Sequence, residues 1–377
     1  MKFLCVTHFF ESHGGGIERV AGHLNRHIAH AGHDVCWAAS AADPAPCDAA
    51  VKVLPLRCIN PLEKFTGLPM PIPMASACVT MRQAVRWSDV IVIHDALYMT
   101  SLLAMMFAIM ARKPVVLIQH IAEIEFAHPV MRWLMRLANR LVTRPVLGMA
   151  DQTIFISNTV REAFADMQMK RAALLLFNGV DTEIFRVAPG IDRAAVRGSH
   201  GLPPAGTLAV FVGRFVKKKG MAVLQELARQ RSEISFVLVG TGPIDPRRWR
   251  LPNIHVLGTL QPAALAELYH AADFLVLPSV GEGYPLVIQE AMVCGLSVIC
   301  GKESARADPA ASRWLHGVVI DLSDPAGSAA CVAGALDAGM LVDGERRQMA
   351  SYAASAYSWP TMAAAIAALS HRLIAAR

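Results

Sequence analysis

Short apolar runs recur along the chain, and each is separated from the next by a stretch whose residues favour helix. In the first half these runs are residues 2–6, 34–38, 51–54, 89–93, 115–118, 152–156 and 173–177. In the second half they are residues 208–212, 235–239, 255–258, 274–277, 297–300 and 317–320. Buried strands that alternate with helices are typical of parallel sheets covered by helices. The pattern therefore predicts an α/β fold.

A stretch rich in glycine and proline, residues 187–207, separates the two sets of predicted strands. The chain has 377 residues, which is long enough for two domains that each bury a core. We therefore expect a first domain at 1–188, a linker at 189–206, a second domain at 207–358 and an alanine-rich final helix at 359–377.

Composition narrows the class of protein. Apolar residues make up 54% of the chain and charged residues 18%, a balance that argues against extensive disorder. The net charge of +6 suits anionic partners in general and does not indicate nucleic acid. The eight cysteines form no C-x-x-C pair, so we expect reduced thiols in the cytoplasm. Residues 3–10 are too short for a secretory signal, and the longest apolar run, 96–111, is shorter than the roughly 18 residues of a spanning helix.

Cations cluster where the predicted strand 208–212 ends. Arg214 follows that strand, and Lys219 precedes the next helix. An arginine fork and a lysine point charge can neutralise two phosphate groups, and parallel sheets bind ligands at this end of their strands. We therefore expect Arg214 and Lys219 to bind a phosphorylated ligand, whereas the two lysines between them suit a solvated loop.

A second segment places two carboxylates eight positions apart across a predicted loop-to-helix junction. Glu282 lies in the loop after the predicted strand 274–277, and Glu290 lies in the helix that follows. Pro285 suits the first turn of that helix, whose free amides attract phosphate. We expect Glu290 to accept hydrogen bonds from ribose hydroxyls and Glu282 to face a sugar. The alternative is an ordinary exposed glutamate on the helix.

The first half of the chain offers two weaker features. Gly15 and Gly16 lie between strand 2–6 and a helix start, where glycines let the backbone approach a phosphate, although plain turns share this composition. His120 follows strand 115–118, at the end where parallel sheets place ligand groups. The alternative for His120 is a strand-end histidine that is bonded to backbone.

Two sets of basic residues recur with helical spacing. We interpret one set as a solvated face that holds no metal: His23, His27 and His30. The other set recurs every four positions beside Trp133 and several leucines, and Pro145 is expected to end its helix: Arg132, Arg136, Arg140 and Arg144. A basic amphipathic helix is typical of a protein that contacts an anionic membrane surface. The alternatives are a solvated arginine face, or arginines that reach phosphates in a cleft.

Together these motifs resemble the signature of glycosyltransferase family 4. The resemblance rests mainly on Gly-Arg-x4-Lys-Gly at 213–220, on Glu-Gly-Tyr-Pro at 282–285 and on Glu290. Further similar motifs are Asn-Gly-Val-Asp at 178–181, Val-Gly-Thr-Gly-Pro at 239–243, Ala-Asp at 272–273, Pro-Ser at 278–279 and Tyr-Ser-Trp at 357–359. The likeness extends over nearly the whole chain and is strongest from 151 to 300.

The resemblance implies a GT-B architecture, in which two Rossmann-like domains face a cleft and the last helix crosses back to the first domain. It also implies sugar transfer from a UDP- or GDP-sugar with retention of anomeric configuration, without a metal or a cofactor. The chain has no D-x-D pair, which agrees with charge stabilisation by cations and helix amides. In that family the residues matching the following positions contact the donor or take part in catalysis: Gly15, Gly16, His120, Arg214, Lys219, Glu282, Gly283, Tyr284, Pro285, Leu286 and Glu290. Pro285 stands where many relatives have a second glycine.

We therefore expect a hexosyltransferase that passes the sugar to a glycan or a lipid-linked acceptor in cell-envelope or exopolysaccharide synthesis. It would act in the cytoplasm, on the inner face of the membrane. One alternative is a catalytically silent partner that binds a glycan or regulates a complex. Another is a different reaction on the same fold, such as a nucleotide-sugar epimerase or a phosphorylase. The presence of both cations and both glutamates favours transfer.

Overall fold

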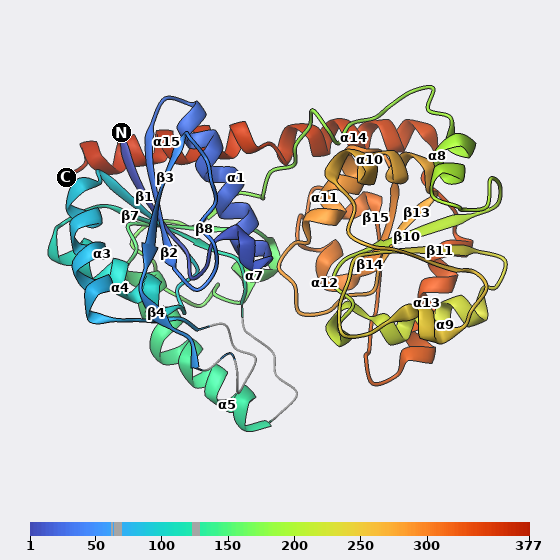
Figure 1. Cartoon of the computed structure of the whole chain (residues 1–377), viewed down its shortest axis with the longest axis horizontal. Coiled ribbons are helices and arrows are strands. Elements are labelled where there is room, and N and C mark those ends of the chain that lie inside the picture. Colours follow the sequence, from blue (N-terminus) through green and yellow to red (C-terminus); the bar gives the residue numbers. More distant parts are fainter. Residues whose placement is uncertain (62, 64–69, 123–128) are drawn as a thin grey trace. The chain divides into compact units, whose positions relative to one another are not determined.

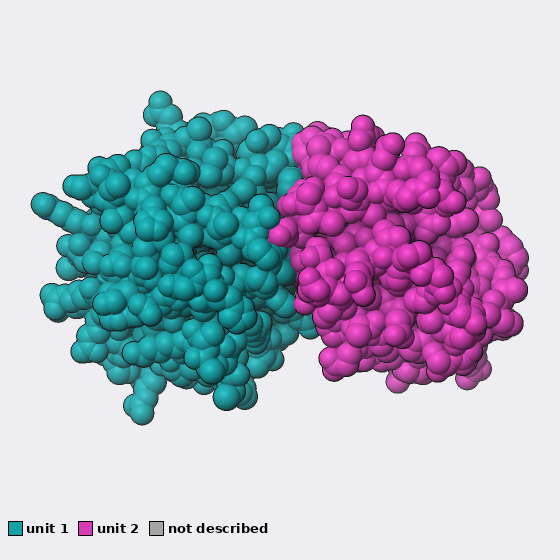
Figure 2. All heavy atoms as spheres, turned by 90° about the horizontal axis from the view of Figure 1, so that it is seen from above, with its two compact units in different colours: residues 1–179, 359–377 teal, residues 180–358 magenta. Residues whose placement is uncertain are grey.

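The computed structural model describes residues 1–61, 63, 70–122 and 129–377. The chain divides into two compact units (Figures 1 and 2). Unit 1 contains Met1–Gly179 together with Trp359–Arg377, and unit 2 contains Val180–Ser358. The chain therefore passes from one unit to the other twice, after residue 179 and after residue 358.

Unit 1 is built on a seven-stranded sheet in the order β3-β2-β1-β6-β7-β8-β9, with every pairing parallel. Its strands are β1 (Lys2–Val6), β2 (Asp34–Ser40), β3 (Val51–Leu56), β6 (Val90–His94), β7 (Val115–Gln119), β8 (Gln152–Phe155) and β9 (Leu174–Leu175). The central strands read as continuous apolar runs because both of their faces are buried. A short antiparallel pair, β4 (Cys58–Ile59) and β5 (Ile72–Pro73), was not predicted, since two-residue strands leave no hydrophobic pattern.

Helices pack on the sheet of unit 1 and complete its core (Figure 1). The described helices of unit 1 are α1 (Gly16–His30), α3 (Ala75–Trp87), α4 (Met99–Met110), α5 (Pro129–Ala138), α6 (Arg144–Met149), α7 (Asn158–Glu162) and α15 (Trp359–Ala375), with a 3₁₀ turn η1 (Glu11–His13) and a π-helical turn η2 (Asn139–Thr143). Met81 of α3 and Ala104 of α4 are buried in one cluster with Leu4 and Ile91 of the sheet. Among the described residues, no helix is both long enough and apolar enough to cross a membrane.

Unit 2 is built on a six-stranded parallel sheet in the order β12-β11-β10-β13-β14-β15. Its strands are β10 (Leu208–Val212), β11 (Ser235–Val239), β12 (Ile254–Leu257), β13 (Phe274–Leu277), β14 (Ser297–Gly301) and β15 (Leu315–Val318). Its helices are α8 (Arg193–Ser199), α9 (Met221–Gln230), α10 (Pro262–Ala271), α11 (Leu286–Val293), α12 (Lys302–Ala305), α13 (Pro325–Asp337) and α14 (Asp343–Ala356), with 3₁₀ turns η3 (Lys217–Lys219), η4 (Pro246–Trp249) and η5 (Ser312–Trp314). The two parallel sheets confirm the α/β fold that the apolar pattern predicts.

The predicted linker at 189–206 is part of unit 2 instead. It contains α8, whose Arg197 side chain is only 4% exposed. The Arg197 guanidinium donates to the carbonyl of Ala271 at 3.0 Å and pairs with the Asp273 carboxylate at 3.2 Å. A buried arginine that is paired and hydrogen-bonded ties the segment to the sheet, while its glycines form turns. Composition alone does not distinguish such a packed segment from a linker.

The interpretation of His23 and His27 as solvated is wrong. Both side chains are half-buried, and His23 stacks on Trp359 with ring centroids 5.2 Å apart. The ring centroid of His27 lies 6.4 Å from that of Trp359. Both histidines therefore contribute to the contact between α1 and α15 within unit 1. Because α15 is the last helix of the chain, its packing on α1 could not be read from local spacing.

Candidate functional site

The strand order of unit 2 changes direction at β10, whose neighbours are β11 on one side and β13 on the other. In open α/β sheets, ligands bind outside the carboxyl ends of the strands at such a switch point. The loops after β10 and β13 carry Lys219 and Glu282, and the two side chains meet there. Nζ of Lys219 lies 2.6 Å from Oε1 and 2.8 Å from Oε2 of Glu282. The structure thus brings together two groups that the sequence places in separate motifs.

Close packing of backbone holds the loops around this ion pair. Gly220 has φ +74°, and a Cβ atom there would lie 2.2 Å from the carbonyl oxygen of Pro278. Gly240 has φ +139°, and a Cβ atom there would lie 2.0 Å from the carbonyl oxygen of Gly213. Only glycine fits positions that combine a positive φ with so close an approach. The loops after β10, β11 and β13 therefore form one compact edge.

Arg214 lies on this edge, in the loop between β10 and η3, and it is exposed. The next residue is fixed by two backbone hydrogen bonds, because the amide of Phe215 donates to Thr241 at 2.9 Å and its carbonyl accepts from Ile244 at 3.1 Å. Lys217 and Lys218 are also exposed, as a solvated loop requires. Arg214 therefore presents a guanidinium to solvent beside the pair formed by Lys219 and Glu282.

Helix α11 begins at Leu286, directly after the loop that carries Glu282. Pro285 occupies the position just before the first turn, not a position inside it as the sequence suggests. The first amides of a helix have no partner within the helix, so the N-terminus of α11 offers donors to an anion. Gly283 is half-buried, so its backbone lies near the surface of the same loop.

The Tyr284 side chain points into unit 2 and anchors this loop. Its hydroxyl lies 2.9 Å from the hydroxyl of Tyr357, which donates to Oδ2 of Asp308 at 2.7 Å. Tyr352 donates to the same oxygen at 2.7 Å. Burial raises the pKa of Tyr284 and of Tyr357, so both remain neutral donors. Sequence analysis did not predict this network, because its members are far apart along the chain.

Glu290 projects from α11 within the same unit. Its Oε2 accepts a hydrogen bond from the Tyr269 hydroxyl at 3.3 Å. Burial raises the pKa of Tyr269, and the nearby Glu290 charge raises it further. Glu290 itself is half-buried. A neutral tyrosine therefore orients a carboxylate that still reaches the surface.

Unit 1 has its own switch point, between β1 and β6. His120, which follows β7, is buried there, and its Nε2 lies 2.9 Å from Nδ1 of His94. Burial lowers the pKa of His120 well below its usual value, so the ring is neutral. The Asp95 carboxylate accepts from the amide of His120 at 2.9 Å. His120 therefore lies at the ligand-binding edge, within a buried polar cluster.

The cluster contains residues that sequence analysis missed. Nε2 of His8 lies 2.9 Å from Oε1 of Glu18, and the His8 ring stacks on Tyr98 at 3.7 Å. Asp95 is wholly buried with φ +61°, and burial raises its pKa to about 7. His8 and Asp95 could have been predicted as site residues from the sequence, because each follows an apolar strand closely. Gly15 and Gly16 lie at the start of α1, next to Glu18 of this cluster.

Solved structures of glycosyltransferases share this arrangement of two parallel-sheet units. Sucrose-phosphate synthase from Thermosynechococcus elongatus matches with a TM-score of 0.72 and 18% identity, over 100% of both chains. HepE from Anabaena, solved in complex with UDP-glucose, matches with a TM-score of 0.69 and 17% identity, over 98% of this chain and 99% of that chain. The fold is therefore the GT-B fold of glycosyltransferases.

Two family models together cover most of the chain. The model described as Glycosyltransferase Family 4 matches residues 14–184, and the model described as Glycosyl transferases group 1 matches residues 206–338. The chain belongs to this family of glycosyltransferases.

Curated relatives match a shorter part of the chain. This chain is 32% identical over 216 residues to D-inositol 3-phosphate glycosyltransferase 2 of Catenulispora acidiphila. The match covers 52% of this chain and 49% of that protein. The matches to such curated relatives cover between 29% and 49% of the relatives' own length.

Proposed function

We propose that the protein is a glycosyltransferase that moves a sugar from a UDP- or GDP-sugar to a hydroxyl group, with retention and without a metal. The observation that carries the proposal is the pair formed by Lys219 and Glu282 at the switch point of unit 2. Arg214 and the N-terminus of α11 lie on the same edge. Cations and helix amides suit a diphosphate, and carboxylates suit sugar hydroxyls.

The pair suits a nucleotide-sugar because Lys219 and Glu282 can each form further hydrogen bonds while they remain paired with one another. An ammonium group has three N–H donors, and the two Glu282 oxygens engage at most two of them. Lys219 can therefore hold a phosphate oxygen while it keeps Glu282 in place. Glu282 can accept from sugar hydroxyls, and Glu290, oriented by Tyr269, can accept from ribose hydroxyls.

In the proposed reaction, the bond between C1 of the sugar and the phosphate oxygen breaks. A new bond forms between C1 and the acceptor oxygen on the same face of the ring. The departing phosphate oxygen takes the proton of the acceptor hydroxyl, so no protein base is required. Lys219, Arg214 and the amides of α11 stabilise the charge that develops on the leaving diphosphate. The proposed reaction requires that water be excluded at this stage, so that transfer outcompetes hydrolysis.

We propose a glycan or lipid-linked acceptor, handled in the cytoplasm at the inner face of a membrane. Helix α5 supports the membrane part of this proposal. Trp133 is 60% exposed and Val130 57% exposed, and both lie on the helix that carries Arg132 and Arg136. Exposed apolar side chains beside arginines suit the boundary between anionic headgroups and acyl chains.

The donor site is tested by calorimetric titration of the protein with UDP and with GDP. One of the two should bind, and Lys219→Ala should weaken it by roughly 10- to 100-fold, because a hydrogen bond to a charged group contributes about 1.5–3 kcal/mol. Lys217→Ala is the matched control, since it removes the same charge from an exposed position of the same turn. Equal effects of the two variants would contradict the proposed site. No binding of either nucleotide would favour the silent-partner alternative.

A further inference from the structure

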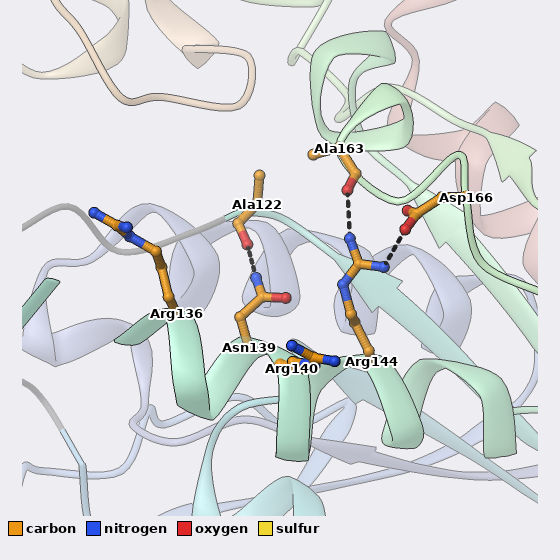
Figure 3. A pocket seen from close by; sticks show the side chains of 7 residues that line it. All are labelled: Ala122, Arg136, Asn139, Arg140, Arg144, Ala163 and Asp166. Atoms are coloured by element: carbon orange, nitrogen blue, oxygen red, sulfur yellow. Dashed lines mark hydrogen bonds and ion pairs between the residues drawn. The ribbon is translucent and has the colours of Figure 1, made fainter. Parts of the chain in front are cut away.

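One hollow of unit 1 lies beside its ligand-binding edge, along α5, η2 and α6 (Figure 3). Arg144 there donates to Oδ2 of Asp166 at 2.8 Å, and Asn139 donates to the carbonyl of Ala122, just after β7, at 2.7 Å (Figure 3). The helical segment continues through Pro145, which was expected to end it, because this residue lies in the first turn of α6. Parallel sheets bind ligands at this edge, so this hollow is part of the site described above.

A second hollow, of about 490 Å³, lies at the opposite edge of the same sheet. Its walls come from the ends of α4 and α6, from the starts of β7 and β8, from the segment before β9 and from the residues after α15. The residues that line it are Ile109, Arg112, Lys113, Val115, Met149, Asp151, Lys170 and Arg377. Four cations and one carboxylate, +4 and −1, give this lining a formal charge of +3. The amino ends of the strands point away from the edge that carries His120, so the hollow is separate from the candidate site.

Arg112 occupies a position at which glycine is usual. It follows α4 with φ +53°, and its amide donates to the carbonyl of Ile109 at 3.1 Å. The amide of Lys113 donates to the carbonyl of Ala108 at 2.9 Å, which completes a Schellman motif. Left-handed backbone is unfavourable for a residue with a Cβ atom, so the turn is less stable with arginine than with glycine. Backbone strain of this kind points to a function for the side chain, an exposed guanidinium that lines the hollow.

Asp151 holds two of the other cations in place. Its Oδ2 accepts from the amide of Val115 at 2.9 Å and from Arg377 at 2.7 Å, and its Oδ1 accepts from Lys170 at 3.2 Å. Burial raises the pKa of Asp151, but these hydrogen bonds lower it by more, so the carboxylate is charged at neutral pH. The side chain of Asp151 is 16% exposed and that of Lys170 is 49% exposed. The carboxylate therefore forms the floor of the hollow, and the cations reach its mouth.

We propose that this hollow binds a soluble molecule that carries two phosphate groups and is not a reactant of the transfer. Within the described part of the chain, no carboxylate is paired with Arg112 or Lys113, so both charges are available to a ligand. A formal charge of +3 suits a diphosphate or a bisphosphate better than a single carboxylate. The planar fork of arginine also matches phosphate oxygens in a bidentate way.

The shape of the hollow favours a small molecule. Its volume of about 490 Å³ falls within the range of about 300–1,000 Å³ that is typical of small-molecule sites. Ile109 and Met149, which are 52% and 40% exposed, offer apolar contacts to the organic part of such a ligand. The inference does not depend on the transfer reaction, because no residue of the donor site lines this hollow.

Calorimetric titration of the full chain with inorganic pyrophosphate tests the site, because this probe carries neither a nucleoside nor a sugar. Arg112→Gln should weaken binding by about tenfold, since it removes a charge-assisted contact to phosphate. Arg171→Gln should weaken binding less than about twofold, because the effect of an exposed charge outside the hollow is screened. Arg171 is the matched control, since it is exposed, adjoins Lys170 and does not line the hollow.

Two further variants separate this site from folding and from the donor site. Arg112→Gly should lose affinity for pyrophosphate as Arg112→Gln does, yet its melting temperature should rise, because glycine favours the left-handed backbone. Lys219→Ala weakens the donor site, so pyrophosphate that binds there is recognised by its loss in this variant. Titration of the wild-type protein with UDP and GDP reports the donor proposal separately.

Losses in both Arg112 variants, with Arg171→Gln close to the wild type, would support the site. Equal losses in Arg112→Gln and Arg171→Gln would show general attraction between charges and overturn the proposal. Binding that is lost only in Lys219→Ala, or no binding at millimolar pyrophosphate, would overturn it as well. Flotation with phosphatidic acid vesicles is measured in parallel. If flotation depended on Arg112 while pyrophosphate did not bind, the cations would belong to a lipid contact and the soluble ligand would be refuted.

Discussion

Tyr357→Phe removes a single hydroxyl that connects the loop before α11 to the core of unit 2. The Tyr357 hydroxyl has one hydrogen, which it donates to Asp308, so the hydroxyl of Tyr284 must donate to Tyr357. The substitution therefore deletes one charge-assisted and one neutral hydrogen bond. It also leaves Tyr284 with a weak sulfur acceptor, Met292, at 3.6 Å. The ring of Tyr357 is wholly buried, so the packing is retained.

The expected cost follows from these two bonds. A hydrogen bond to a charged group contributes about 1.5–3 kcal/mol, and a neutral bond contributes about 1 kcal/mol. Asp308 keeps donors from Tyr352 and from the amide of Ala310, which reduces the penalty. We expect Tyr357→Phe to lower the free energy of unfolding of unit 2 by about 2–3 kcal/mol. Because Tyr284 holds the loop before α11, nucleotide affinity should fall roughly tenfold, which is about 1.4 kcal/mol.

Urea unfolding and calorimetric titration with the nucleotide that binds measure these two quantities. Tyr352→Phe is the matched control, since it removes a donor from the same oxygen of Asp308 without touching Tyr284. The control should cost about 1–2 kcal/mol and leave nucleotide affinity within about twofold. If Tyr357→Phe proved no more damaging than Tyr352→Phe in either assay, the anchoring role of Tyr284 would be refuted.

Three further substitutions test other parts of the structure. Gly220→Ala should lower the free energy of unfolding by at least about 2 kcal/mol in urea titrations and weaken nucleotide binding, because φ is +74° and Pro278 leaves no room for a Cβ atom; a neutral effect would show that the loops are loosely packed. Asp95 has a folded pKa of about 7, above its unfolded value, so the folded state binds the extra proton and wild-type stability falls as pH rises from about 4 to 7. Asp95→Asn should remove that fall, so its unfolding midpoint should exceed that of the wild type by more at pH 8 than at pH 5, and the opposite order would contradict the buried carboxyl. Arg197→Met should lower the melting temperature, because it removes one of the two arginines paired with Asp273 and the hydrogen bond to the carbonyl of Ala271. The expected cost is about 1.5–3 kcal/mol, since Arg193 keeps its pair with the same carboxylate, and no change in calorimetry would mean that Arg197 does not hold α8.

The sheets were predictable because their signal is local. Each long strand of a buried parallel sheet must be apolar on both faces, as in β1 and β10, so it appears as an apolar run in the sequence. The segment at 189–206 was not predictable in the same way. Its glycines and prolines have the composition of a linker, and only the three-dimensional partners of Arg197 place it in unit 2.

The candidate site was predictable in part. Lys219 and Glu282 each follow an apolar strand, and parallel strands bring such positions to one edge. The hydrogen bond between Tyr284 and Tyr357 could not be predicted, because the two residues are far apart along the chain and such a bond produces no repeating pattern in the sequence. His8 was missed although it follows the apolar strand β1 closely, which is the same signal that identified His120 after β7.

Release of UDP or GDP from nucleotide-sugars tests the central claim most directly. The purified protein is incubated with a panel of UDP- and GDP-sugars in the presence of a metal chelator, and the free nucleoside diphosphate is measured over time. We predict slow release from one donor, abolished in Lys219→Ala and in Glu290→Ala and retained in Lys217→Ala. No release from any donor, or release that survives both substitutions at the switch point of unit 2, would contradict the account.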